Sequence, residues 1–420
     1  MSNTISFLCE SILAILIFYN LGTAYFSKDK VQIWSPLSVI SLTFIYYCLV
    51  PFWLGTKEQY VIDESMHNGH LFHIAALLSY VSIMFGFKYS KTKERFAKWA
   101  NSLTSVNVGK IGIFITIIGL MGYASVRGFH FTMAYNGADL SQMSTGGLTY
   151  YAMMMLDMLP FASAMLLVGL KDNKKNVWFL VFFWLIMVQF LIAGARWRIV
   201  VAMIALLTTY HSYPQIKKIN VPVLATLAVV VYLVFSAMDM VRVRGGGINM
   251  AEASKLNYND IKQGSNENYD VYWFSLMSIE KITETDHHTY FTPILTAVLM
   301  PIPRSVFPWK PDAQYILDLE SSVGAYGGSA YLNFVEAYFA FGWIGVALFG
   351  WFLGWLARVF WDFYDRNRQS RASIIGLGVF SGFCYVMVSR GYLAASFTSI
   401  ILAIYVPFWI IQLCNKFVKK

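Results

Sequence analysis

Residues 301–312 read PIPRSVFPWKPD and lie late in the long polar loop of an otherwise apolar chain. Five of the eleven prolines in the protein fall within residues 293–311. Because proline lacks a backbone N–H and fixes φ, this segment is not expected to form a regular helix or a central strand. It is predicted to be a rigid loop that presents two cations, Arg304 and Lys310.

The rest of the chain has the composition of a membrane protein. Hydrophobic residues make up 57% of the 420 residues, and charged residues make up 13%. This apolar excess is typical of a polytopic membrane protein and not of a soluble globular one. The first apolar run, residues 5–26, is long enough to span a bilayer and lacks a basic leader, so it is interpreted as a transmembrane helix. The four cysteines show no paired ligand spacing, so no metal site is expected.

Eleven apolar runs, most of them close to the roughly twenty residues that span a bilayer, predict transmembrane helices. They are residues 5–26, 33–54, 71–88, 109–126, 148–170, 177–194, 199–213, 220–239, 331–357, 372–390 and 394–414. We therefore expect an all-α polytopic membrane protein in three parts. Residues 1–239 hold the first eight helices, residues 240–330 form one long outer loop with short and interfacial helices, and residues 331–420 hold the last three helices.

Every second connection between these runs is basic. Positively charged connections stay in the cytoplasm, so the C-terminus is predicted to be cytoplasmic. An odd number of spans then puts the N-terminus outside. The alternation accounts for most of the net charge of +9, and no nucleic-acid partner is expected.

Lysine and arginine are distributed differently on this topology. Fifteen of the twenty lysines fall on the cytoplasmic side, but seven of the twelve arginines fall on the outer side. These outer arginines are Arg127, Arg196, Arg198, Arg242, Arg244, Arg304 and Arg390. The planar fork of arginine suits bidentate binding of phosphate, so an anionic lipid-linked substrate is the expected partner. The alternative is that each arginine reaches a lipid headgroup from the end of its helix.

Two pairs of outer arginines, Arg196 with Arg198 and Arg242 with Arg244, are separated by one residue. Side chains two positions apart share a side in an extended chain and diverge on a helix. Each pair therefore works as a clamp only where its backbone is extended. The three glycines at 245–247 permit this after Arg244, and their amides could form an anion-binding concavity.

Several ionisable residues are candidates for proton transfer. Glu336 lies about one turn inside an apolar run, where an ionisable group is costly and is a functional candidate. Its alternative role is a structural ion pair with an outer arginine, and for Asp157 such a pair is the favoured interpretation. His287 and His288 lie in the outer loop, and an imidazole works as a base near neutral pH.

Three segments together resemble the O-antigen polymerase (Wzy-type) family. They are AGARWRIV at 193–200, PIPRSVFPWKPDA at 301–313 and GGSAYLNFVEAYFAFGWIGV at 327–346. The resemblance implies a GT-C-like, all-helical glycosyltransferase on the outer face of the bacterial cytoplasmic (inner) membrane. Its implied partners are undecaprenyl-diphosphate-linked oligosaccharides as donor and acceptor, membrane lipid, and a chain-length regulator. Family members often carry arginines in two outer loops, but the shorter outer connections of this chain are very small.

The chemistry of such a transfer fits these residues. A growing glycan moves from a lipid diphosphate to a sugar hydroxyl, and the protein must neutralise the charge that develops on the diphosphate. Preorganised arginines do this without a metal or other cofactor, and a general base adds about 10² to 10⁴ in rate. The base is predicted to be Glu336 or His287. The predicted diphosphate ligands are Arg196, Arg198, Arg242, Arg244, Arg304, Lys310 and Arg390.

Three other functions compete with a polymerase. An O-antigen ligase has a similar number of spans and a long outer loop, but it transfers a finished glycan to lipid A core. A polysaccharide flippase or transporter would show internal repeats or charges through the whole membrane depth, and the sequence shows neither. A lipid-binding scaffold would bind the lipid-linked sugar without turnover.

Overall fold

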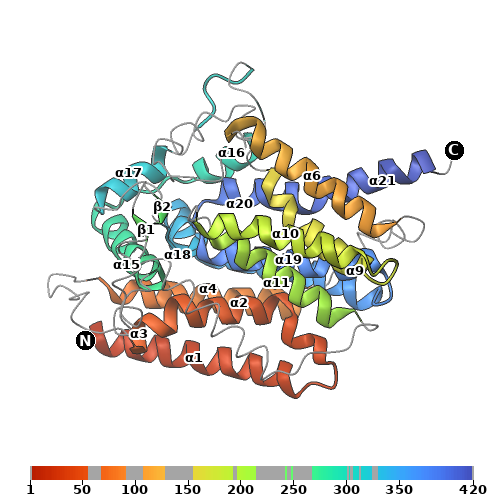
Figure 1. Ribbon diagram of the computed structural model, residues 1–420. Coiled ribbons are helices and arrows are strands. Elements are labelled where there is room, and N and C mark those ends of the chain that lie inside the picture. The colour runs from red at the N-terminus through yellow and green to blue at the C-terminus, as the bar shows by residue number, and fades with distance from the viewer. Residues whose placement is uncertain are drawn as a thin grey trace.

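Long helices lie side by side in the computed structural model of the chain, with most axes along one direction (Figure 1). The structure describes residues 2–54, 68–90, 107–127, 155–192, 196–213, 242–243, 247–248, 267–299, 302, 306–311, 314–323 and 330–418.

The first half of the chain supplies helices α1 to α11. Their bounds are α1 Ser2–Phe26, α2 Pro36–Phe44, α3 Val50–Leu54, α4 His70–Tyr89, α6 Val108–Arg127, α9 Leu159–Gly169, α10 Asn176–Ile192 and α11 Arg196–Ser212. A π-helical turn, Ile45–Leu49, joins α2 to α3, and a 3₁₀ turn, Met155–Met158, leads into α9. Helix α2 begins where Ser35 accepts a hydrogen bond from the N–H of Ser38 and Pro36 occupies the first turn, which are favoured residues for these positions.

The second half supplies a small hairpin, three helices of the long loop and the last spans. The strands β1 Arg242–Val243 and β2 Gly247–Ile248 pair in antiparallel fashion. The loop helices are α15 Glu267–Thr285, α16 Thr292–Leu299 and α17 Gln314–Ser322. The last helices are α18 Asn333–Arg366, α19 Arg371–Ser389, α20 Leu393–Ile400 and α21 Val406–Val418, with a π-helical turn, Ile401–Tyr405, between the last two.

Six helical segments of the described residues are long and apolar enough to cross a membrane. They are Thr4–Phe26, Pro36–Trp53, His70–Tyr89, Asn333–Arg366, Arg371–Ser389 and Leu393–Leu413. Shorter apolar helices are Val108–Gly122, Met155–Gly169 and Asn176–Leu185. Each of these nine helical segments overlaps one of the eleven predicted transmembrane runs. Helix α11 overlaps a tenth predicted run, residues 199–213. The eleventh run, residues 220–239, lies outside the described residues. The chain is therefore a helical multi-pass membrane protein, while the count of eleven spans and the GT-C-like arrangement stay predictions.

Basic connections that the sequence assigns to one side of the membrane lie at one end of the bundle. Arg368, after α18, places its Nη2 2.6 Å from Oδ2 of Asp29, which follows α1. Arg371, at the start of α19, bonds both carboxylate oxygens of Asp172, between α9 and α10, at 2.7 Å. Helices α15 and α17 lie at the opposite end (Figure 1). The predicted alternation of the basic connections is therefore confirmed for these three.

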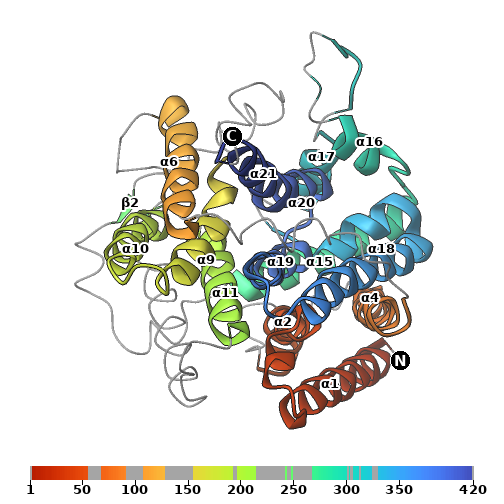
Figure 2. The ribbon, with the colours of Figure 1, turned by 90° about the vertical axis from the view of Figure 1, so that its right-hand side faces the viewer.

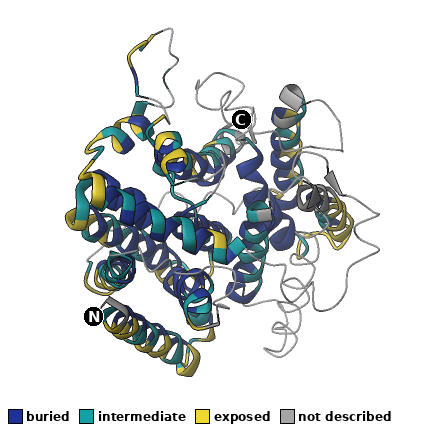
Figure 3. Ribbon diagram, turned by 90° about the vertical axis from the view of Figure 1, so that its left-hand side faces the viewer, coloured by how far each residue is buried: buried dark blue, intermediate teal, exposed yellow. Residues whose placement is uncertain are grey.

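Helix α19 forms the centre of the bundle and is buried along nearly its whole length. Helices α18 and α4 pack directly against each other (Figure 2). Glycine permits this approach, because a Cβ on Gly354 would lie 2.0 Å from the carbonyl oxygen of Ile83. Exposed residues lie along the outer helices of the bundle (Figure 3). Large apolar side chains such as Phe18 and Trp178 are among the exposed residues, as expected for a lipid-facing surface.

Helix α18 is interrupted where the sequence predicts one continuous span. Gly342 has φ +59° and ψ −142°, a conformation that only glycine adopts readily. The carbonyl of Phe339 accepts a hydrogen bond from the N–H of Thr289 at 2.9 Å, and the carbonyl of Ala340 accepts one from Tyr290 at 3.0 Å. The break therefore separates a short first segment, residues 333–340, from a long second segment.

The proline segment is irregular in its described part, as predicted. Residues 306–311 form neither helix nor strand. Val306 and Trp309 are largely exposed, whereas Lys310 is buried and its Nζ donates to the carbonyl of Ile302 at 2.7 Å. Lys310 therefore stabilises the fold of its own loop, and Arg304 lies outside the described residues.

Candidate functional site

The candidate site lies where the start of α18 meets the link between α19 and α20. The N–H of Gly391 donates to the carbonyl of Tyr331 at 2.6 Å. A Cβ on Gly391 would lie 2.0 Å from the ring of Tyr331, so only glycine fits this crossing. The N–H of Leu393 donates to Oε2 of Glu336 at 2.6 Å. Two segments separated by 57 residues are thus joined at the predicted catalytic glutamate.

The side chain of Glu336 is buried, and both of its carboxylate oxygens accept hydrogen bonds. Its exposed fraction is 3%. Its Oε1 accepts a hydrogen bond from the hydroxyl of Tyr315 in α17 at 2.6 Å, and its Oε2 is held by Leu393. The predicted alternative was an ion pair with an arginine, and none of the described arginines pairs with Glu336. Each carboxylate oxygen has two lone pairs, so each retains one for a further donor.

The charge of Glu336 acts on two tyrosines that precede the span Asn333–Arg366. Burial raises the pKa of the Tyr315 phenol far above its usual range, and Glu336 raises it further. Burial, with the charges of Glu336 and Glu320, likewise raises the pKa of Tyr331. Both phenols therefore stay protonated. The hydroxyl of Tyr331 is buried and has no hydrogen-bond partner among the described residues.

Arg390 is the outer arginine that the structure brings to this junction. Its Nη2 forms an ion pair with Glu267 at the start of α15, and its side chain is 25% exposed. Burial alone would lower the pKa of Arg390, but Glu267 raises it above the usual value, so the guanidinium stays charged. The Nε of Arg390 is buried and has no hydrogen-bond partner in the described part of the chain. Such an N–H costs roughly 1 to 3 kcal/mol, which an anionic ligand would relieve.

Helix α15 is anchored by a buried network that the sequence did not predict. Glu10, inside α1, places Oε1 2.7 Å from Nδ1 of His73 in α4. The hydroxyl of Tyr272 in α15 lies 3.5 Å from Nε2 of the same histidine. This contact fixes α15 against the bundle one and a half turns after Glu267, and so helps to position the partner of Arg390.

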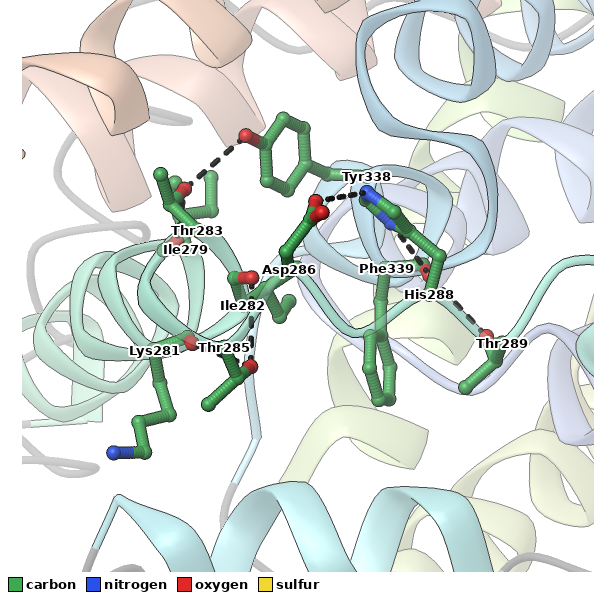
Figure 4. Close-up of polar contacts among 10 residues, drawn as sticks. All are labelled: Ile279, Lys281, Ile282, Thr283, Thr285, Asp286, His288, Thr289, Tyr338 and Phe339. Atoms are coloured by element: carbon green, nitrogen blue, oxygen red, sulfur yellow. Dashed lines mark hydrogen bonds and ion pairs between the residues drawn. The ribbon is translucent and has the colours of Figure 1, made fainter.

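His287, the second predicted base, lies in the loop between α15 and α16. Its side chain is exposed, and its ring centroid lies 5.8 Å from that of Phe339. His288 has a different role, because its Nδ1 lies 3.3 Å from the carbonyl oxygen of Phe339 and its Nε2 lies 4.0 Å from Asp286 (Figure 4). His288 thus contacts the break in α18, and His287 lies near Phe339, which follows Glu336 by about one helical turn.

Arg196 and Arg198 do not form the predicted extended clamp. Both lie in the first turn of α11, where side chains two apart diverge. Arg198 places Nε 3.4 Å from Oδ1 of Asp157 and its guanidinium 4.4 Å from the ring of Trp197. The other oxygen of Asp157 accepts a hydrogen bond from Ser399 at 2.6 Å. The predicted pairing of Asp157 with an arginine is confirmed, and Arg198 is committed to it.

The remaining predicted arginines are only partly described. Arg242 is extended in β1 opposite Ile248, which meets the backbone condition for a clamp at that residue. Arg244 and Arg304 lie outside the described residues. Arg127 ends α6.

Sequence reasoning missed three residues of the site, namely Glu267, Tyr315 and Tyr331. Glu267 lies 123 residues from Arg390, and Tyr315 lies 21 residues from Glu336. No local motif marks either of them, because their roles arise from tertiary contacts. Within the described residues, no group of three or more histidine, cysteine, aspartate or glutamate side chains could hold a metal ion.

Comparison with known proteins assigns the chain to a family. No curated protein and no solved structure matches it. The family model for O-antigen polysaccharide polymerase Wzy matches residues 1–420, which is the whole chain. Because this match covers the whole chain, the protein belongs to the O-antigen polysaccharide polymerase Wzy family.

Proposed function

We propose that the protein polymerises undecaprenyl-diphosphate-linked oligosaccharide repeat units at the junction of Glu336 and Arg390. The observation that carries this proposal is that the segment 390–393 contains Arg390 and also bonds Glu336 through the N–H of Leu393. Leu393, at one end of this segment, holds a carboxylate with both oxygens oriented, and Arg390, at the other end, supplies a charged guanidinium whose buried Nε–H has no partner among the described residues. These are the two groups that transfer from a lipid diphosphate needs.

The reaction divides between the two residues. Glu336 accepts the proton of a sugar hydroxyl on the acceptor unit, and that oxygen bonds to the anomeric carbon of the donor glycan. The bond from this carbon to the diphosphate oxygen breaks, and its electron pair stays on the lipid diphosphate. Arg390 binds the oxygen on which negative charge develops, a charge-assisted hydrogen bond that contributes about 1.5 to 3 kcal/mol.

Two hydrogen bonds fix the orientation of the Glu336 carboxylate. Tyr315 and the N–H of Leu393 hold one lone pair on each oxygen, which fixes the plane of the carboxylate. A positioned base contributes about 10² to 10⁴ in rate. The buried hydroxyl of Tyr331 offers a further polar group for the acceptor sugar.

The charge pattern supports an orientation. The ion pairs of Arg368 and Arg371 lie at the basic end of the bundle, which we assign to the cytoplasm. The site then lies at the outer face of the cytoplasmic membrane, with the N-terminus outside and the C-terminus inside. This is where we place the lipid-linked donor and acceptor, and a chain-length regulator is a proposed further partner.

The remaining basic residues have proposed roles around the second lipid diphosphate. Arg242, Arg244 and Arg304 belong to the same long loop as α15 and α17, and we propose that they bind the diphosphate of the acceptor. Arg304→Ala is then expected to abolish long glycan while the protein still inserts. Arg196 and Lys310 are weaker candidates, and Arg198 would first have to release Asp157.

The proposed function is tested by polymerisation with purified components. Wild-type protein in lipid nanodiscs receives only the lipid-linked repeat unit. A ladder of longer lipid-linked glycans is expected. A protein that stays inactive until lipid A core is added would instead be a ligase, and binding without turnover would indicate a scaffold.

A further inference from the structure

Helix α16 presents an unusual apolar face. Phe291, Ile294, Leu295 and Val298 have exposed fractions of 62%, 43%, 47% and 66%. Spacings of three and four residues put these side chains on one side of the helix. Residues 291–299 include no charged side chain. A face of this kind is poorly suited to water, so a partner must cover it.

The other face of α16 packs on a membrane span. Ala297 packs against Ala394 of α20, and these small side chains allow the helices to come close. Helix α20 is the first part of the span Leu393–Leu413. The bundle axis runs from left to right in Figure 1. Along this axis α16 lies at the same position as α20, whereas α15 and α17 lie closer to the left end. Helix α16 is therefore beside the span and not above its end.

The exposed face continues into a lipid-facing surface. The rings of Phe291 and Phe341 lie 5.0 Å apart, so the start of α16 contacts the break in α18. Directly after the break, Ile344 and Leu348 of α18 are 69% and 61% exposed on one side of the helix. Because α18 is a membrane span, these side chains contact lipid.

We propose that α16 is inserted beside α20 into the outer part of the bilayer, with Phe291, Ile294, Leu295 and Val298 against lipid acyl chains. Thr289 and Tyr290 join α16 to the carbonyls of residues 339–340, one turn from Glu336. The inserted helix thus fixes the depth of this part of α18. That the fixed depth serves a lipid diphosphate rests on the proposed function, whereas the insertion itself does not.

Site-specific fluorescence in nanodiscs tests the insertion. Val298→Cys is labelled with the environment-sensitive dye NBD in phosphatidylethanolamine and phosphatidylglycerol nanodiscs, with Cys414 replaced by serine. Cys9, Cys48 and Cys384 are buried, and the protein that carries only the replacement of Cys414 by serine serves as the labelling blank. Ser321→Cys, on the exposed end of α17, is the matched control.

The expected result is a blue-shifted label at 298, quenched at least threefold more by doxyl-labelled lipid than by iodide. The label at 321 should show the opposite preference. Quenching of residue 298 mainly by iodide would overturn the proposal. Protection from both quenchers would also overturn it, because protein and not lipid would then cover α16.

A charge on the proposed face supplies a second test. Leu295→Glu in the Val298→Cys protein is expected to shift the NBD emission to the red and to increase iodide quenching. An unchanged emission would contradict insertion. The two proposals fail in different ways. If the label at 298 is exposed to lipid but the wild-type protein does not polymerise, only the proposed function is refuted. If the wild-type protein polymerises but the label at 298 is exposed to iodide, only the insertion is refuted.

Discussion

Two of the outer arginines, Arg198 and Arg390, are each paired with a carboxylate, but the two pairs differ in structure. Arg198 lies against Asp157 and Trp197, and Ser399 occupies the second oxygen of Asp157. Arg390 is paired with Glu267, but its buried Nε has no partner among the described residues. The first pair has a partner for each carboxylate oxygen, and the second keeps a donor in reserve.

This difference separates a structural from a functional arginine. Arg198 leaves Asp157 paired, has no buried donor without a partner among the described residues, and so offers little to a ligand. A charged group with an unsatisfied donor beside an oriented carboxylate can bind an anion. Both arginines belong to the outer set that charge counting identifies, so only the contacts distinguish them.

The largest effect is expected for Glu336→Gln, which keeps the shape of the side chain and removes the base. Turnover should fall by about 10² to 10⁴, while expression and membrane insertion stay normal. The measurement is the rate of glycan elongation by purified protein. Glu284→Gln, an exposed glutamate of α15, is the control, and equal activity of the two variants would remove Glu336 from the mechanism.

The Arg198 pair should affect stability more than chemistry. Arg198→Met leaves Asp157 buried and unpaired, which costs about 3 to 5 kcal/mol. The double variant with Asp157→Asn should recover much of that loss. Thermal unfolding in detergent, followed by intrinsic fluorescence, checks both. A double variant no more stable than Arg198→Met would show that charge pairing does not explain the contact.

A smaller loss is expected for Gly342→Ala at the break in α18. The φ of +59° is unfavourable for alanine, and such strain costs about 1 to 3 kcal/mol. Gly22→Ala in α1 is a suitable control, because a Cβ there meets nothing within 4 Å. Thermal unfolding of the two variants should differ by several degrees, and identical melting would mean that α18 is not broken as described.

The smallest effect is expected for Tyr315→Phe. This change removes one hydrogen bond to Glu336, and Leu393 still holds the other oxygen. A loss of about 1.4 kcal/mol corresponds to a tenfold fall in elongation rate. Tyr290→Phe, on an exposed ring outside the junction, should elongate normally. A Tyr315→Phe enzyme with wild-type rate would show that this phenol does not position the carboxylate.

The helical membrane class and most helix positions could be predicted from sequence, because apolar runs of span length report them directly. Short helices in the outer loop were also predicted in outline, and α15, α16 and α17 lie there. The break at Gly342 was not, because glycine is common in membrane helices and the hydrogen bonds that fix the break come from residues 289–290.

The site was predictable only in part. Glu336 stood out because an ionisable group inside an apolar run is rare. Its partners Tyr315 and Leu393, and the Glu267 partner of Arg390, lie far away in sequence and carry no motif. The clamp of Arg196 and Arg198 required an extended backbone, and this condition is not met because α11 begins at Arg196, a boundary that the charge pattern does not reveal.

The most direct test compares Arg390→Lys with Arg198→Lys in one elongation assay, because lysine keeps the charge and loses the planar fork. The purified variants receive the undecaprenyl-diphosphate-linked repeat unit, and the initial rate per folded molecule is measured. Arg390→Lys is expected to lose about 10²-fold or more, and Arg198→Lys is expected to stay within about twofold of wild type, since its change is one of packing and pairing. Equal rates, or a greater loss for Arg198→Lys, would contradict the assignment of the reaction to the junction of Glu336 and Arg390.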